Sequence, residues 1–471
     1  MHFKRVRLIQ RRKSVGLTQE DLADALGVER STLSRWERAE TEPQPWLRPR
    51  LAGLLKVTAA ELEELLSDVV PLPGKANDYR LLSSVPLDFS LARHHTVRIL
   101  EGFSAYDIAS RRQVVARLAV LTGAVLLQPV RQWMAGLPVV PAGTAPTSEA
   151  LAELEQAVVL FRRWDASGAG GLRRKAVVGQ LNALTESLTE RHDAETTRRM
   201  FHVAAELAQL AGWMAYDQGL HGMAQRYYVL GLHACREAAA PALGAKIIGD
   251  MTQLSTALGH FDDSLNLTRT ALCGLPYGAH DSVRAELLGL EARAYARLGE
   301  REAGNAVRSA EACVEVWQEA QDEVRPDWLH YMDQAEVDCL AANAYTELAL
   351  ASGEPRRWRR YAARAERHTL RARAARSAGY TRSRVFDEVR LARVRLAQRE
   401  PVEAAAVAWA SLRMAEETRS SLVVDWFVRL DGLLVGRYPD CREVAAFHEG
   451  LRDYLRRVAP QREREIVRSD V

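Results

Sequence analysis

Hydrophobic residues near the N-terminus recur at helical spacing, and residues that begin or end helices interrupt them. Gly16 ends the first run, and Thr18, with Asp21 three positions later, marks the start of the second. Gly27 ends the second run after a short stretch. The pattern predicts five short helices in residues 1–66, over about residues 4–15, 18–26, 30–38, 46–55 and 58–66.

The third predicted helix has two distinct faces. Leu33 and Trp36 fall on one side and are expected to pack on the first two helices. The opposite face is polar, and Arg side chains there suit a DNA major groove, because a guanidinium can donate two hydrogen bonds to guanine. This polar face carries Ser31, Ser34, Arg35 and Arg38, with Arg30 near the helix start.

Two short helices joined by a glycine-containing turn are typical of a helix-turn-helix. The segment GLTQEDLADALGVERSTLSRWERAETEP resembles the Cro/CI-type repressors of the XRE family. The similarity lies in the LTQ opening, the LA-x-x-LG turn, the STLS run, the WER end and the following Pro43. It covers about residues 4–66 and implies a DNA-binding domain. A plain helical bundle is the alternative interpretation, since Arg on an exposed helix face is usually only solvated.

The resemblance implies roles for individual residues. Arg12 and Glu37 match a structural ion pair between the first and third helices of that family. Base contacts are expected from Arg30, Ser31 and Arg35. Contacts to the DNA backbone are expected from Thr18, Gln19, Ser34 and Arg38. The chain departs from the family at Ala39, where a glycine is common, and at Glu29, where Ser or Thr usually caps the recognition helix.

The sequence changes character after residue 66. Residues 67–90 contain three prolines and no helical period, so residues 67–103 are expected to form a linker or extended arm. From about residue 104 to 471 nearly everything is predicted to be helical. Gly219, Gly259 and Gly299 recur at a spacing of 40, each between two helical stretches.

These repeats resemble tetratricopeptide (TPR) repeats. Small or aromatic residues occupy the tight-packing positions of that pattern, among them Gly212, Ala224, Tyr228, Ala292, Tyr295 and Gly304. Stacked helix pairs form a solenoid with a concave binding face. The predicted fold class is therefore all-α, a five-helix DNA-binding domain followed by an α-solenoid. This combination resembles the helix-turn-helix regulators with TPR domains found in actinobacteria, which implies dimerisation and control by an effector.

Two clusters in the repeat region are candidates for binding. Polar and aromatic residues gather around one turn and form a candidate ligand site, although aromatic residues at helical spacing are more often core: Tyr216, Asp217, His221, Gln225, Arg226 and Tyr227. Residues 356–399 hold fifteen Arg against three Asp or Glu. That excess suits contact with DNA or an acidic partner, but a solvated face in an Arg-rich protein is the more ordinary explanation.

Composition narrows the function further. The net charge is only +3, although residues 1–56 hold twelve Lys or Arg against seven Asp or Glu. Five scattered cysteines and twelve histidines show no metal-ligand spacing, so neither a metal site nor a cofactor is expected. No nucleophile motif supports an enzyme. Without a signal-peptide pattern or a long apolar run, a cytoplasmic location without membrane contact is expected.

The sequence therefore predicts a dimeric transcriptional regulator that binds double-stranded DNA. A peptide, small molecule or protein bound by the solenoid would control its DNA affinity. The alternative is an interaction scaffold whose helix-turn-helix does not read DNA sequence. Neither the effector nor the dimer surface follows from the sequence.

Overall fold

The computed structural model describes residues 3–37, 41–67, 70–71, 93–109, 118, 120–135, 149–166, 172–189, 192–275, 280–377, 379–418, 420–460 and 462–463. The chain divides into two compact units, Met1–Ser84 and Val85–Val471. The fold is all-α, as expected, with one minimal antiparallel ladder in the first unit. In that ladder β1 (Phe3–Lys4) pairs with β2 (Val70–Pro71).

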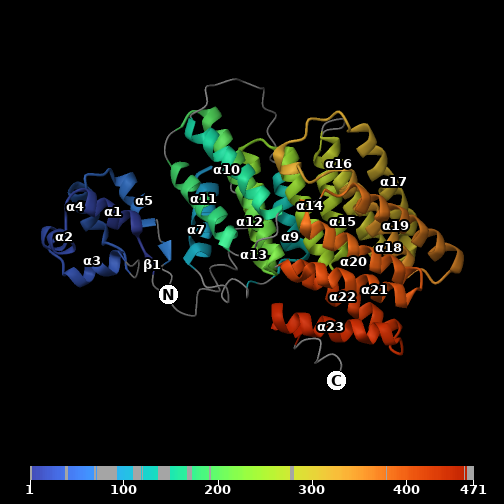
Figure 1. Ribbon diagram of the computed structural model, residues 1–471. Helices are drawn as coiled ribbons and strands as arrows, with labels where there is room; N and C mark the ends of the chain where they lie inside the picture. Colours follow the sequence, from blue (N-terminus) through green and yellow to red (C-terminus); the bar gives the residue numbers. More distant parts are fainter. Residues whose placement is uncertain are drawn as a thin grey trace. The chain divides into compact units, whose positions relative to one another are not determined.

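The first unit contains the five predicted helices, with ends within a few residues of the expected positions (Figure 1). The fourth helix begins later than expected because Pro45–Leu47 forms a 3₁₀ turn, η1, before it. The helices are α1 (Val6–Ser14), α2 (Gln19–Leu26), α3 (Arg30–Glu37), α4 (Arg48–Leu55) and α5 (Ala59–Ser67).

The predicted caps of the first unit are confirmed. The Thr18 hydroxyl accepts from the Asp21 amide at 3.1 Å, and the Asp21 carboxylate accepts from the Thr18 amide at 2.8 Å. Thr58 and Glu61 form the same reciprocal pair at the start of α5. Gly27 ends α2 with a φ of +72°, a left-handed conformation that glycine adopts without a steric penalty. Local sequence rules thus account for the helix boundaries here.

Apolar residues on the inner sides of these helices form one small core. Leu22, Ala23 and Leu26 of α2 meet Leu33 and Trp36 of α3, and all five are buried, the last two as predicted. The expected ion pair also lies inside, where the Arg12 Nε donates to the Glu37 carboxylate at 2.6 Å.

In its described residues, the second unit begins with four helices and continues as six helix pairs. The first four are α7 (Arg93–Ala109), α9 (Gly123–Ala135), α10 (Glu149–Ala166) and α11 (Leu172–Ser187). Helix α7 runs without a break from Arg93 to Ala109, so it crosses the boundary that was predicted between residues 103 and 104. Among the described residues, the region assigned to a linker therefore includes the start of this helix.

Each of the six pairs is a helical hairpin whose two helices pack against each other. The first pair is α12 (Ala194–Asp217) with α13 (His221–Glu237), and the second is α14 (Pro241–Ala257) with α15 (Phe261–Gly274). The remaining pairs are α16 (Asp281–Arg297) with α17 (Ala303–Glu319), α18 (Gln334–Ala351) with α19 (Pro355–Ala375), α20 (Thr381–Ala397) with α21 (Pro401–Met414), and α22 (Ser421–Arg437) with α23 (Arg442–Val458). Three further 3₁₀ turns are η2 (Glu300–Glu302), η3 (Asp327–Leu329) and η4 (Ala415–Glu417).

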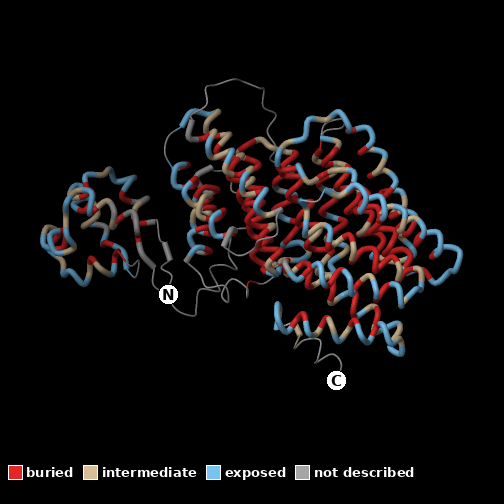
Figure 2. Tube along the Cα trace, in the orientation of Figure 1, coloured by how far each residue is buried: buried red, intermediate tan, exposed pale blue. Residues whose placement is uncertain are grey.

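The first helices of successive pairs, α12, α14, α16, α18, α20 and α22, pack on one another in that order. They form an inner layer, and most of the second helices lie outside it. Figure 2 shows buried positions running through the middle of this unit, with exposed positions along its outer helices and turns. The array is the expected α-solenoid.

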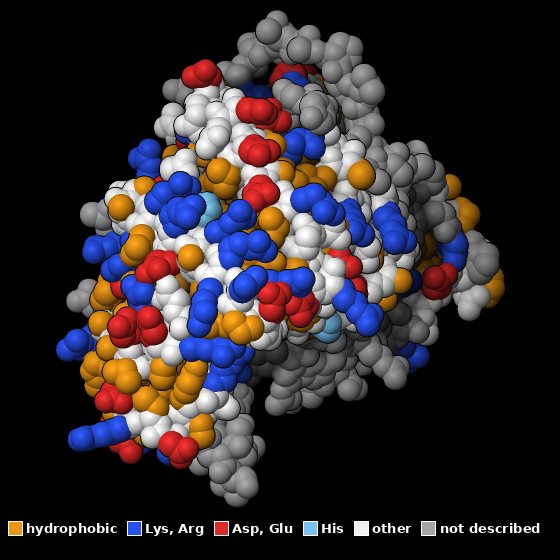
Figure 3. Space-filling view, turned by 90° about the vertical axis from the view of Figure 1, so that its right-hand side faces the viewer, with side chains coloured by type: hydrophobic (Ala, Val, Ile, Leu, Met, Phe, Trp, Pro, Cys, Tyr) orange, Lys and Arg blue, Asp and Glu red, His pale blue; other side chains and the backbone are white. Residues whose placement is uncertain are grey.

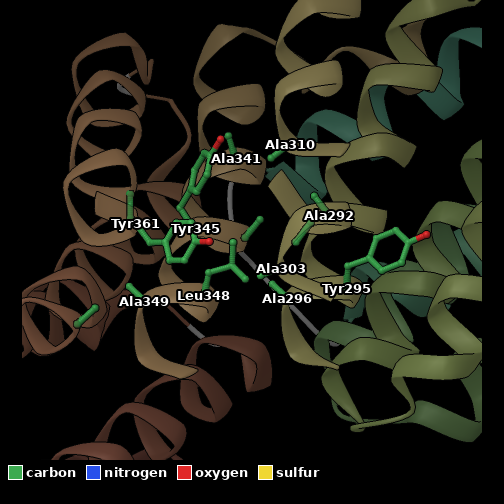
Figure 4. Close-up of a cluster of buried hydrophobic side chains, with 14 of the residues drawn as sticks. Ala292, Tyr295, Ala296, Ala303, Ala310, Ala341, Tyr345, Leu348, Ala349 and Tyr361 are labelled. Atoms are coloured by element: carbon green, nitrogen blue, oxygen red, sulfur yellow. The ribbon is translucent and has the colours of Figure 1, made fainter. Parts of the chain in front are cut away.

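The three glycines at a spacing of 40 occupy the turns within the first three pairs. Gly219, Gly259 and Gly299 all have positive φ, at +73°, +87° and +104°. Gly212 allows close packing, since a Cβ at this position would lie 2.6 Å from the Tyr228 ring. Small residues also let neighbouring pairs approach, as in the alanine-rich cluster between α16, α17, α18 and α19 (Figure 4).

The last pair of the solenoid returns to the first. Helices α12 and α22 contact each other, and the Ser420 hydroxyl donates to the Asp217 carboxylate at 2.5 Å. Arg382 at the start of α20 bridges Asp165 of α10, at 3.0 Å, and Asp217 of α12, at 3.2 Å. The Arg429 guanidinium donates to the Ala257 carbonyl at 2.6 Å. These contacts close the inner layer around a cavity.

Candidate nucleic-acid interface and inner cavity

Helix α3 presents its predicted polar face to solvent. Arg30, Ser31 and Arg35 are exposed and Ser34 is half-buried, while Leu33 and Trp36 fix the opposite face in the core. Arg38, also assigned to this face, lies outside the described residues, as does Ala39. The three residues expected to contact bases therefore share an exposed surface of one helix.

Acidic neighbours contact two of these residues. The Arg30 guanidinium pairs with Glu20 at 3.2 Å, and both side chains are more than half exposed. The Ser31 hydroxyl donates to the Glu29 carboxylate at 2.9 Å. Exposed pairs of this kind contribute little free energy, so a phosphate or base can replace the acidic partner. Arg35 forms no ion pair with the residues that the structure describes.

The two residues assigned to the DNA backbone at the start of α2 already have partners. The Gln19 side-chain amide donates to the Glu37 carboxylate at 2.5 Å, and the Thr18 hydroxyl donates to Asp21 at 2.6 Å. An amide NH₂ group has two hydrogens, so Gln19 keeps one donor for a phosphate. Glu37 thus positions both Arg12 and Gln19, which links the core ion pair to the candidate DNA-binding surface.

Several basic residues of the first unit serve its own structure. Arg5 is buried, and its guanidinium donates to the Leu66 carbonyl at 2.5 Å and the Trp36 carbonyl at 2.7 Å. Burial lowers the pKa of Arg5, an effect that Glu42 partly offsets. Arg11 donates to the carbonyl of Leu55 at 2.9 Å. The positive excess of residues 1–56 therefore overstates the charge available to DNA, and no sequence signal separated these inward arginines from the outward ones.

The second candidate site is a partly open cavity within the solenoid, with a volume of about 200 Å³. Its walls come from the inner helices α12, α14, α16, α18, α20 and α22, from α10, and from the segment around Trp328 and Tyr331. The surface is both aromatic and charged. The repeat pattern did not predict this cavity, because the contacts that form it join helix pairs far apart in the sequence.

The candidate ligand residues around the α12–α13 turn do not gather at this cavity. Tyr216 lines it, and burial raises the Tyr216 pKa to about 12. Asp217 does not line the cavity, and its carboxylate is bound to Arg382 and Ser420. His221 is partly buried beside Tyr216, with a ring-centroid distance of 6.0 Å.

The other three residues of that group lie on α13, outside the inner layer. The Gln225 amide bonds to the backbone of Leu121, and Tyr227 donates to Asp107 of α7 at 2.6 Å. Arg226 is buried and donates to the Gly222 carbonyl at 2.7 Å. The structure therefore gives Gln225, Arg226 and Tyr227 packing contacts and does not bring them to the cavity, because α13 is the second helix of its pair.

The arginine-rich segment 356–399 finds its acids on other helices. Arg364 pairs with Glu311, Arg393 pairs with Glu347, and Arg382 pairs with Asp165. Other members stack on aromatic rings, such as Arg399 on Trp358 at 4.7 Å. On the face shown in Figure 3, Lys and Arg side chains lie among acidic and hydrophobic ones. The local excess of charge is thus largely matched in space.

In the part of the chain that the structure describes, no three or more His, Cys, Asp or Glu side chains are placed to hold a metal ion. No helix there combines the length and hydrophobicity needed to cross a bilayer.

Comparison with known families gives one match. Residues 8–62 match the family model for the helix-turn-helix, which spans α1 to α5 and includes the whole exposed face of α3. No curated protein and no solved structure matches the chain. The match supports DNA binding by the first unit and does not extend to the solenoid.

Proposed function

We propose that the protein is a sequence-specific transcriptional regulator that binds double-stranded DNA through α3. The observation that carries this proposal is the exposed row of Arg30, Ser31 and Arg35 on a helix whose other face is fixed by Leu33 and Trp36. The helix-turn-helix match over the same residues supports it. Arg30 and Arg35 donate to base edges, and Ser31 supplies a smaller donor and acceptor.

The backbone of DNA is held by neighbouring groups. Gln19 donates its second amide hydrogen to a phosphate, and the amides at the start of α2 add a favourable dipole. Thr18, Ser34 and Arg38 flank this surface in the sequence. Glu37 keeps Gln19 in place from inside the domain.

We further propose that two copies of the chain bind DNA together and that an effector controls their DNA affinity. Regulators of this type bind paired half-sites about 34–36 Å apart, one for each recognition helix of a dimer. The solenoid resembles TPR arrays in its hairpin pairs and glycine turns, and it provides the effector site. Binding there changes DNA affinity through a coupling free energy of about 1–3 kcal/mol.

The cavity also bears on the scaffold alternative. A TPR-like scaffold would use an open concave face, whereas Arg382, Ser420 and Arg429 join the ends of this inner layer. A volume of about 200 Å³ admits a small molecule and excludes a folded partner. The small volume of the cavity therefore favours a regulator that senses a small effector.

The proposal is tested by selecting genomic DNA fragments with the full chain in 150 mM salt, an order-of-magnitude match to physiological ionic strength, and sequencing them. The wild type is expected to enrich a motif with two related half-sites. The Arg30→Ala/Arg35→Ala variant is expected to lose it, while the matched Arg359→Ala/Arg360→Ala variant, altered on exposed positions of α19, keeps it.

Three outcomes separate the alternatives. Loss of the motif only in the α3 variant supports the assigned readout. Enrichment that survives Arg30→Ala/Arg35→Ala removes these residues from base recognition. If the wild type enriches no motif in repeated selections and instead captures one stoichiometric protein partner, the regulator proposal is wrong and the scaffold takes its place.

A further inference from the structure

The hydrogen-bonding state of the cavity indicates what it binds. Four acids line it, and each has a cationic partner. Asp165 is paired with Arg382, Asp250 with Lys246, and Asp387 with Arg390, at 3.0, 2.5 and 2.7 Å. Glu336 pairs with Arg376 at 3.3 Å. The carboxylates of the cavity are therefore already satisfied and do not call for a cationic ligand.

Two of the lining cations are not satisfied in this way. Arg162 is only 5 % exposed; its Nη1 donates to the Gln209 side chain at 2.9 Å, but its Nε and Nη2 have no hydrogen-bond partner. The acid that it pairs with, Glu206, is 3.9 Å away. Arg293 has an unpartnered Nε, and its ion pair with Glu347 is 3.7 Å long because Arg393 holds that acid more closely, at 2.9 Å.

A guanidinium is basic enough to keep its proton in proteins, so both side chains are treated as cations. Burial lowers the pKa of Arg162, with Glu206 opposing the shift. Burial also lowers the pKa of Arg293, to about 10, with Glu347 opposing it. A buried donor on a charged group costs free energy when it lacks an acceptor. The polar groups of the cavity that lack partners are thus N–H donors on two cations, Arg162 and Arg293.

The remaining walls are flat and apolar. Trp213, Trp328, Phe386 and Trp426 contribute ring surfaces, and the Arg293 guanidinium lies over the Trp426 ring at 5.6 Å from its centroid. Such walls favour a planar body that can stack or meet them edge-on. Binding sites of this kind combine an apolar lining with a few polar groups that orient the ligand.

We propose that the cavity binds a small organic acid, a flat apolar body bearing a carboxylate, with the carboxylate on Arg162. The guanidinium offers two donors to the two oxygens of a carboxylate, the geometry that makes such pairs strong. Both donors are buried, so binding requires the guanidinium to reorient toward the acid. Arg293 provides a second positive charge in the same cavity.

This inference rests on the proposed function, because it is the regulator proposal that makes the bound acid an effector. The binding step itself involves no DNA. If the acid binds and no DNA motif is found, the regulator proposal fails and this site stands. If a motif is found and no acid binds, the reverse holds.

The test is a titration of the full chain, without DNA, by calorimetry and by the fluorescence of the cavity tryptophans. The probes are indole-3-acetate and phenylacetate, their neutral amides indole-3-acetamide and phenylacetamide, and inorganic phosphate. We expect at least one acid to bind about tenfold or more tightly than its amide, because the amide loses the charge-assisted bonds. Phosphate, which has no apolar body, is expected to bind more weakly than the acid.

Variants of α10 provide the matched comparison. Arg162→Gln removes the charge inside the cavity, whereas Arg163→Gln makes the same change at an exposed neighbour. We expect Arg162→Gln to weaken acid binding about tenfold or more and Arg163→Gln to leave it unchanged. The acid–amide comparison uses the wild type alone, so it remains informative if Arg162→Gln does not fold.

Three results would overturn the proposal. One is that neither acid binds at 5 mM, a concentration chosen because a site of roughly millimolar affinity is still detected there. Another is that an amide binds as tightly as its acid. The third is that Arg162→Gln folds and binds the acid as the wild type does.

Discussion

The two units of this protein use arginine in opposite ways. In the first unit, Arg30 of α3 has a side chain 63 % exposed, and its acidic partner is equally open to solvent. In the second unit, Arg382 is 11 % exposed and joins acids from two other helices. Both units are rich in arginine by composition, yet only the exposed arginines can exchange their partners for DNA at little cost. Burial and pairing therefore decide function here, and the number of arginines does not.

Inside each unit the same residue type also builds structure. Arg12 of the first unit pairs with buried Glu37, and Arg393 of the second pairs with buried Glu347. Removing one member of a buried pair leaves an uncompensated charge, which is much more damaging than losing a pair at the surface. The contrast between exposed and buried pairs can be measured directly.

The largest expected effect follows from breaking a buried cluster. Glu347 on α18 faces Arg393 at 2.9 Å, Arg297 at 3.2 Å and Arg293 at 3.7 Å. Glu347→Gln is expected to lower the free energy of unfolding by about 3–5 kcal/mol, because the buried arginines lose their anion. Urea unfolding followed by circular dichroism measures it.

The control for that change is an exposed pair in the same unit. Glu311→Gln breaks its pair with Arg364, in which both side chains are more than a third exposed, and is expected to cost about 0–1 kcal/mol. Equal effects of Glu347→Gln and Glu311→Gln would contradict the contrast between buried and exposed arginine pairs.

The same cluster predicts a dependence of stability on pH. Burial alone would raise the pKa of Glu347, but Arg393, Arg293 and Arg297 outweigh it and lower the pKa from 4.5 to about 2. Because the folded protein has the lower pKa, Glu347 contributes its stability above about pH 4.5, and this contribution is lost as pH falls toward 2.

Unfolding midpoints between pH 6 and pH 2, a range chosen to span the ordinary and shifted carboxylate pKa values, test this sign. The difference in stability between the wild type and Glu347→Gln should shrink as the solution becomes more acidic. A difference that stays constant across the range would mean that the arginines do not depend on the ionised form of Glu347.

The sequence predicts those features of each unit that depend on nearby residues, and it misses those that depend on distant contacts. The helices, caps and core of the first unit depend on neighbours a few positions apart, such as Thr18 with Asp21, and local rules located them. The orientation of Arg5 and Arg11 depends on carbonyls from α4, α5 and the end of α3, and nothing local signals it. The Lys and Arg excess of residues 1–56 therefore includes arginines whose guanidinium groups are bound within the domain.

In the second unit the repeat period located the turns but not the site. The period places Gly219 and Gly259 between helices without telling which helix of a pair lies inside. Gln225 and Tyr227 consequently became ligand candidates, although α13 is an outer helix. The cavity depends on pairs such as Arg382 with Asp165, which are 217 residues apart, and no local pattern encodes that contact.

A smaller effect is expected on the DNA-facing surface. Glu29 accepts from Ser31 and adds a negative charge at the start of α3. Glu29→Gln removes the charge and nearly keeps the shape, so DNA affinity is expected to rise about two- to fivefold, the range of an exposed charge interaction. Fluorescence anisotropy on the selected site measures it, and the gain should diminish at high salt because screening weakens exposed charges.

Asp24→Asn is the matched control, since it removes one exposed charge from α2 without altering the recognition helix. An equal gain from Asp24→Asn would show a general effect of net charge. A loss of affinity in Glu29→Gln would mean that Glu29 positions Ser31 for base contact.

An effect of similar size is expected on the backbone, where the two units should behave alike. The turn after α2 and the turn after α14 have the same hydrogen bonds, and Gly27 and Gly259 occupy the left-handed position in each. A Cβ at either glycine meets no atom within 4 Å, so substitution by alanine tests the backbone alone. Gly27→Ala and Gly259→Ala are each expected to destabilise their unit by about 1 kcal/mol.

Ala239 offers the reverse experiment, because it occupies the same position with a φ of +51° and the same hydrogen bonds to the preceding helix. Ala239→Gly is expected to stabilise the second unit by up to about 1 kcal/mol, less the entropy that glycine loses on folding. Ala238→Gly, one position earlier with a helical φ of −79°, should destabilise it. Opposite signs at adjacent alanines would show that backbone conformation, unlike charge, acts identically in both units; a loss in both variants would mean that the φ of Ala239 carries no strain.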